Sequence, residues 1–255
     1  MWVRFPPRAH ERSKWHGESA ACAALAKNRV NNPSFSSSTI KLIAVLAMLI
    51  DHIGLLFFPE QLLWRVIGRL SFPLFALLIA EGFEKTGSVR KYFFRLLAFA
   101  AISQLPYAFF MAAAGVSPYH LNIFFTLASG LLVLILFKKT SPAIATVGAI
   151  LLCAFTEWFG FDYGAYGVLL ILCSSLLLRF RNSGTILITL LSFGNTMVGF
   201  FLGILSVQLF ATMSVPIAYF YNRERGRHLF PRHFFYWFYP VHMLILLCIW
   251  LFVKA

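Results

Sequence analysis

The chain has 255 residues, of which 60% are hydrophobic and only 12% are charged, and its mean hydropathy is +0.77. Soluble domains are about half apolar and a quarter charged, so this composition excludes a soluble globular protein. The formal net charge of +13 does not indicate nucleic-acid binding, because the basic residues form short clusters between apolar runs, as in multi-pass membrane proteins.

Residues 1–37 differ in composition from the rest of the chain. They are basic, contain the pair Pro6-Pro7 and end in a serine-rich stretch, and their apolar run Ala20–Ala26 is too short for a signal-peptide core. We therefore interpret residues 1–37 as a disordered extension, or as the product of a translation start placed too early. Residues 38–255 form the predicted membrane domain.

Window hydropathy over the remaining chain predicts an all-α, polytopic helical bundle with about nine membrane-spanning helices. Irregular backbone at membrane depth has to be covered by protein, which favours a compact bundle. Gly194-Asn195 and Gly199 are the only turn signals that separate the seventh span from the eighth. The predicted spans lie near residues 40–58, 62–83, 90–114, 120–138, 142–158, 164–180, 184–197, 200–221 and 234–254.

Basic residues mark every second connection between these spans, and the alternate connections contain no lysine or arginine. This alternation predicts a multi-pass protein of the plasma or inner membrane, with a cytoplasmic N-terminus and an external C-terminus. The basic positions are Lys41, then Lys85 to Arg95, Lys138 and Lys139, Arg179 and Arg181, and finally Arg223 to Arg232.

The dipeptide Asp51-His52 lies inside the first span, where charged and titratable side chains are costly unless they face protein, water or a reactant. Successive helical residues point about 100° apart, so Asp51 and His52 need partners from different helices. Arg69, in the second span, is the expected partner of Asp51. Pro73 removes the backbone donor to the carbonyl of Arg69 and predicts a kink there. The alternative is an ion pair that only orients the helices.

Lys41 precedes His52 by eleven residues, which is close to three helical turns, so the two share one face of the first span. This spacing suits a long ligand bound at both ends. The alternative is that Lys41 is an anchor at the membrane surface.

Four further polar residues are predicted at a similar depth in the outer half of the membrane, and we expect them on the acceptor side of a site: His120, Asn122, Asp162 and His242. The alternative for each histidine is an ordinary hydrogen bond between helices. The cysteines have neither metal-site nor disulfide spacing, so no metal is expected.

Seven segments in order resemble the TraX family, membrane proteins associated with N-terminal acetylation of conjugative pilin. The resemblance covers about residues 38–254. The matching segments are KLIAVLAMLIDHIG (41–54), GRLSFPLFALLIAEG (68–82), ISQLPY (102–107), LNIFFTL (121–127), DYGAYG (162–167), NRERGR (222–227) and YWFYPVHM (236–243).

This family is similar to the integral-membrane acyltransferases, in which an arginine and a histidine with ten residues between them are characteristic of the first span; here Lys41 stands in the position of the arginine. The resemblance implies that acetyl-CoA enters from the cytoplasm as acyl donor near Lys41 and that His52 is the general base. Asp51 and Arg69 would hold the geometry, and His120 or Asn122 would donate to the oxyanion. The acceptor would be external, such as the N-terminal amine of a pilin.

Two other functions are compatible with the sequence. A transporter or lipid-handling protein would use the intramembrane charges to line a path, although no internal repeat supports this. A non-catalytic assembly factor for a conjugation or secretion apparatus is the third interpretation.

Overall fold

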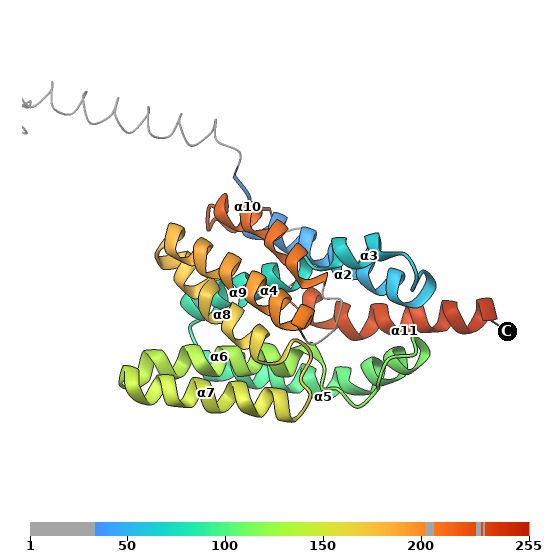
Figure 1. Cartoon of the computed structure of the whole chain (residues 1–255), viewed down its shortest axis with the longest axis horizontal. Coiled ribbons are helices and arrows are strands. Elements are labelled where there is room, and N and C mark those ends of the chain that lie inside the picture. Colours follow the sequence, from blue (N-terminus) through green and yellow to red (C-terminus); the bar gives the residue numbers. More distant parts are fainter. Residues whose placement is uncertain (1–33, 202–206, 228–230, 232, 255) are drawn as a thin grey trace, which may run out of the picture. The chain divides into compact units, whose positions relative to one another are not determined.

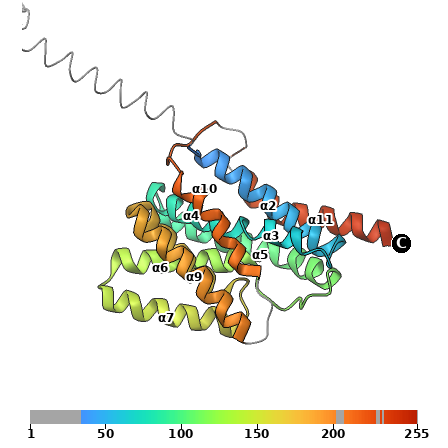
Figure 2. The same ribbon diagram turned by 45° about the horizontal axis from the view of Figure 1, so that its top comes forward.

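The computed structural model of the protein describes residues 34–201, 207–227, 231 and 233–254, so all but the last four residues of the predicted extension 1–37 lie outside the described residues. Every regular secondary-structure element in the described part is a helix, which confirms the predicted all-α class. The only β contacts there are two isolated bridges. The helices, labelled in Figures 1 and 2, are α2 (Ser37–Phe57), α3 (Leu62–Gly68), α4 (Ser71–Lys85), α5 (Val89–Ala113), α6 (Ile123–Lys139), α7 (Pro142–Trp158), α8 (Gly164–Arg179), α9 (Arg181–Phe201), the 3-10 helix η1 (Val207–Met213), α10 (Ser214–Tyr219) and α11 (Phe234–Lys254).

Short polar side chains fix where several of these helices begin. Ser36, Ser88 and Ser141 each accept a hydrogen bond from the backbone N–H three residues later, which satisfies a donor that the first turn leaves free. The predicted kink in the second span is confirmed: α3 ends and α4 begins around Arg69, four residues before Pro73.

Four helical segments in the described part are long and apolar enough to cross a membrane: Ser37–Phe57, Leu62–Lys85 (α3 and α4 together), Val89–Ala113 and Phe234–Lys254. Three more apolar helices are shorter, at Pro142–Trp158, Gly164–Arg179 and Val207–Tyr219. The count of about nine spans and the orientation of the chain stay predictions.

The boundary predicted between residues 197 and 200 is wrong. Helix α9 runs without a break from Arg181 to Phe201 and includes Gly194, Asn195 and Gly199. A turn within an apolar bundle would leave backbone groups without partners, whereas a helix satisfies them internally, and this outweighs the local turn preference of glycine and asparagine.

Helix α4 lies at the centre of the bundle and packs against α2, α6 and α8, which is why most of its side chains are buried. Helix α11 lies against both α2 and α5, and α6 and α7 run side by side (Figures 1 and 2). Residues from α4, α5, α6 and α8, such as Leu74, Phe110, Leu131 and Ile171, form the fully buried core. This packing brings α2, α4, α5 and α11 around one interior space.

Candidate functional site

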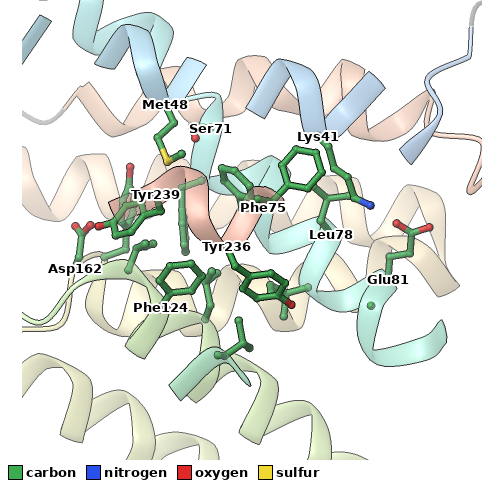
Figure 3. A pocket seen from close by; sticks show the side chains of 18 of the residues that line it. Lys41, Met48, Ser71, Phe75, Leu78, Glu81, Phe124, Asp162, Tyr236 and Tyr239 are labelled. Atoms are coloured by element: carbon green, nitrogen blue, oxygen red, sulfur yellow. The ribbon is translucent and has the colours of Figure 1, made fainter. Parts of the chain in front are cut away.

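A cavity of about 830 Å³ lies between these helices. Lys41 and Glu81 lie at one end and Asp162 lies at the other, with Phe75, Phe124, Tyr236 and Tyr239 between them (Figure 3). We call the end with Lys41 the mouth and the end with Asp162 the closed end. The described residues contain no group of three or more histidines, cysteines, aspartates or glutamates placed to bind a metal.

Asp51 at the closed end is bonded to two arginines. Its carboxylate accepts a hydrogen bond of 2.8 Å from Arg65 and one of 3.3 Å from Arg69. The prediction that Arg69 pairs with Asp51 is therefore confirmed, although Arg65 is the closer partner. Helix α3 can approach because Gly68 has no side chain: a Cβ there would lie 2.0 Å from Asp51 Oδ1. Sequence reasoning did not select Arg65 as a site residue, although it lies one turn from Arg69 on the same face.

His52 also finds its partner on another helix, as the sequence predicts. Its Nδ1 lies 2.6 Å from Nε2 of His242 on α11, and the planes of the two rings are inclined by only 20°, with their centroids 4.9 Å apart. Phe110 covers His52 edge-on at 5.1 Å. His52 borders the cavity and His242 does not, so His242 lies behind His52 and not on the acceptor side where the sequence predicted it.

Asp162 reaches the closed end from the connection between α7 and α8. The neighbouring Tyr163 has φ of 64°, a left-handed conformation that is uncommon for tyrosine, and its ring stacks on Phe72 at 4.1 Å. The carboxylate of Asp162 has no hydrogen bond or ion pair with the described residues, and burial raises its pKa to about 6 although Arg69 opposes the shift. Asp162 is thus a carboxylate that borders the cavity and has no hydrogen-bond partner for its side chain among the described residues.

His120 and Asn122 do not border the cavity. The Asn122 side chain caps α6 and donates to the carbonyl of Ala100 at 2.7 Å and to Gln104 Oε1 at 2.8 Å. His120 Nδ1 lies 3.0 Å from the carbonyl oxygen of Gly160. The residue between them, Leu121, bridges to the chain next to Asp162. Their positions fit support of the Asp162 connection, and neither is placed to donate to an oxyanion in the cavity.

The mouth is basic. Lys41 lies over the ring of Phe235 at 5.6 Å, and the Arg95 guanidinium lies between Tyr92 at 5.3 Å and Tyr236 at 5.0 Å. The Nε of Arg95 is buried and has no hydrogen-bond partner among the described residues. An aromatic bracket of this kind holds a guanidinium in place while leaving its donors free for an anion.

Arg225 and Arg227 complete the mouth from the segment 222–227, which joins α10 towards α11. The Ser38 hydroxyl lies 2.6 Å from the carbonyl oxygens of both arginines, so this segment is fastened to the start of α2. Gly226 has φ of 71°, and a Cβ there would lie 2.3 Å from Ser36 Oγ. Sequence reasoning used these arginines only for orientation, although they lie in the NRERGR segment.

The chain is similar in sequence to known proteins, among them a fimbrial assembly protein. The sequence model of the family described as TraX protein matches residues 36–250. A probable fimbrial assembly protein FimC, serogroup H1, of Dichelobacter nodosus is 29% identical over 241 residues, which cover 84% of this chain and 96% of that protein. Protein TraX of Escherichia coli is 34% identical over 142 residues, 55% of each chain. No solved structure matches.

Proposed function

Because the chain belongs to the TraX family, we propose that it is a membrane acyltransferase of pilus or fimbrial assembly. It transfers an acetyl or other short acyl group from cytoplasmic acetyl-CoA to an acceptor outside the membrane, such as the N-terminal amine of a pilin. The observation that carries this proposal is the layout of the cavity: cations at the mouth, an apolar middle and His52 towards the closed end.

The layout matches the chemistry of a coenzyme A thioester. Lys41, Arg95, Arg225 and Arg227 suit the phosphates, and the apolar middle suits the long uncharged pantetheine arm. Lys41 and His52 are separated by eleven residues of one helix, so roughly 16 Å of the arm would lie along α2. The thioester then reaches His52 with its phosphates still at the mouth.

At the closed end, His52 acts as general base on the acceptor amine. The amine nitrogen attacks the thioester carbonyl, His52 takes its proton, the new C–N bond forms as the C–S bond breaks, and the proton passes to the leaving thiolate. Asp51, fixed by Arg65 and Arg69, keeps the charge at this end balanced. The unpartnered carboxylate of Asp162 faces the space that the acceptor would occupy.

The proposal is tested with purified protein in lipid vesicles, isotope-labelled acetyl-CoA and a synthetic pilin N-terminal peptide, with the product weighed by mass spectrometry. His52→Ala is expected to lose on the order of 10²–10⁴ in turnover, with its thermal unfolding in detergent close to that of the wild type. His233→Ala is the matched control, since His233 is exposed and does not border the cavity. Full turnover of His52→Ala would refute the catalytic assignment.

A non-catalytic assembly factor predicts a different pattern in cells. Pili would be lost when the whole gene is deleted, but they would form with normal, unmodified pilin whether or not His52 is present. The enzyme predicts that His52→Ala leaves pilin unacetylated.

A further inference from the structure

A chain of three groups runs from the backbone of α11 to the edge of the cavity. The carbonyl oxygen of Phe238 lies 2.6 Å from His242 Nδ1, and His242 Nε2 lies 2.6 Å from His52 Nδ1. Each of these contacts is short enough to require a hydrogen between the two atoms. The chain therefore restricts where the protons of both imidazoles can be.

A carbonyl oxygen only accepts hydrogen bonds, so His242 must carry its proton on Nδ1. A neutral imidazole has one N–H, which leaves Nε2 of His242 as an acceptor. The hydrogen between the two rings must then belong to His52 Nδ1. From this sequence of steps we infer that His242 fixes His52 as the Nδ1-protonated tautomer and makes Nε2 of His52 the basic atom.

The surroundings of His52 agree with this assignment. Its ring borders the cavity, and its Nε2 has no hydrogen-bond partner among the described residues. This nitrogen is not fully buried. The lone pair on Nε2 is thus accessible from the space in which the acceptor proton would be released. Without His242, a neutral histidine would be free to place its proton on Nε2 and lose this basicity.

The inference rests on the proposed function for its consequence in catalysis. When His52 takes a proton on Nε2, its Nδ1–H stays bonded to His242, and this charge-assisted bond stabilises the imidazolium. His242 keeps its own proton on Nδ1 throughout and does not touch substrate. It is a positioning residue, with a role comparable to that of the carboxylate behind a catalytic histidine in a serine hydrolase.

The tautomer is measured directly by ¹⁵N NMR of protein labelled at histidine, in detergent and without substrate, with the His52 signals assigned by their loss in His52→Ala. We expect Nδ1–H for His52 in the wild type and in His242→Gln, whose side-chain oxygen can accept the same bond. In His242→Leu, His52 should move towards the Nε2–H form. His233→Gln, a matched change outside the chain of bonds, should leave the His52 signals unchanged.

Turnover provides the second measurement. His242→Leu should reduce kcat by roughly 10²-fold, because the wrong tautomer removes most of the general-base contribution. It should leave KM for acetyl-CoA unchanged, and His242→Gln should recover most of kcat. Nε2–H on His52 in the wild type, or an unchanged tautomer in His242→Leu, would overturn the inference. Expected spectra together with no acyl transfer by the wild type would instead refute the proposed function and leave the tautomer assignment standing.

Discussion

Replacing Asp51 by asparagine should destabilise the protein more than replacing either of its arginine partners. Asp51 is the shared acceptor of Arg65 and Arg69, so its loss leaves two guanidiniums side by side without the carboxylate. Loss of one arginine still leaves Asp51 with the other. The expected order of destabilisation is Asp51→Asn, then Arg69→Gln, then Arg65→Gln.

The solvent exposure of the three side chains determines how much stability each substitution should remove. Those of Asp51 and Arg69 are 14% and 12% exposed, whereas that of Arg65 is 27% exposed and retains more water. Removing one partner of a buried ion pair costs about 3–5 kcal/mol. Because this group is partly hydrated, we expect about 3 kcal/mol for Asp51→Asn, the lower end of that range, and about 1 kcal/mol for Arg65→Gln, as for exposed pairs.

The measurement is the free energy of unfolding in mixed micelles for the single variants and for the double variant Asp51→Asn/Arg69→Gln. The double variant should lose less stability than the two single variants added together, because removing Arg69 relieves the repulsion that the asparagine creates. Equal effects of Asp51→Asn and Arg65→Gln, or additivity in the double variant, would show that water screens the cluster and that the carboxylate is not shared.

Three further outcomes are expected. Arg95→Gln should raise KM for acetyl-CoA about tenfold with kcat unchanged, as expected for loss of a charge-assisted bond. Arg90→Gln, on the same helix but outside the cavity, should leave this KM unchanged. Equal KM values for the two variants would show that Arg95 does not bind the donor. Gly226→Ala should also raise that KM, because its φ of 71° and the 2.3 Å approach to Ser36 force the basic segment away from α2, and unchanged donor binding would show that the segment is not needed. Burial raises the pKa of Asp162 to about 6 from an ordinary value of 3.8, so the folded state binds this proton more tightly than the unfolded state. The stability of the wild type should therefore fall, relative to that of Asp162→Asn, as pH rises from about 4 through about 6. Parallel curves of stability against pH for the two proteins would contradict this.

Most helix positions and one partner of Asp51, Arg69, could be predicted from local features of the sequence. Several helices begin directly after a serine or an asparagine, and a carboxylate inside a span is costly unless it pairs with a cation from a neighbouring helix. Pro73 marked the break between α3 and α4 for a purely local reason. The error near Gly199 arose where a local turn signal competed with the need to satisfy the backbone.

The mouth and the histidine pair could not be predicted from the sequence. His52 and His242 are 190 positions apart, and in a single sequence each is a lone histidine with many alternatives. Arg225 belongs to a basic connection whose charge is already explained by membrane orientation. Its second role depends on the bond to Ser38 near the other end of the domain, which only the folded structure reveals.

Helix α11 supplies His242, which accepts the hydrogen bond from His52, and Tyr236, whose ring contacts the Arg95 guanidinium. It follows every other described helix along the chain. The ribosome therefore synthesises α11 after the other described helices. Until α11 is in place, His52 has no His242 to fix its tautomer, and Arg95 lacks the ring of Tyr236 on one side. In the acyltransferase proposed above, acyl transfer therefore begins only after α11 has packed against α2 and α5.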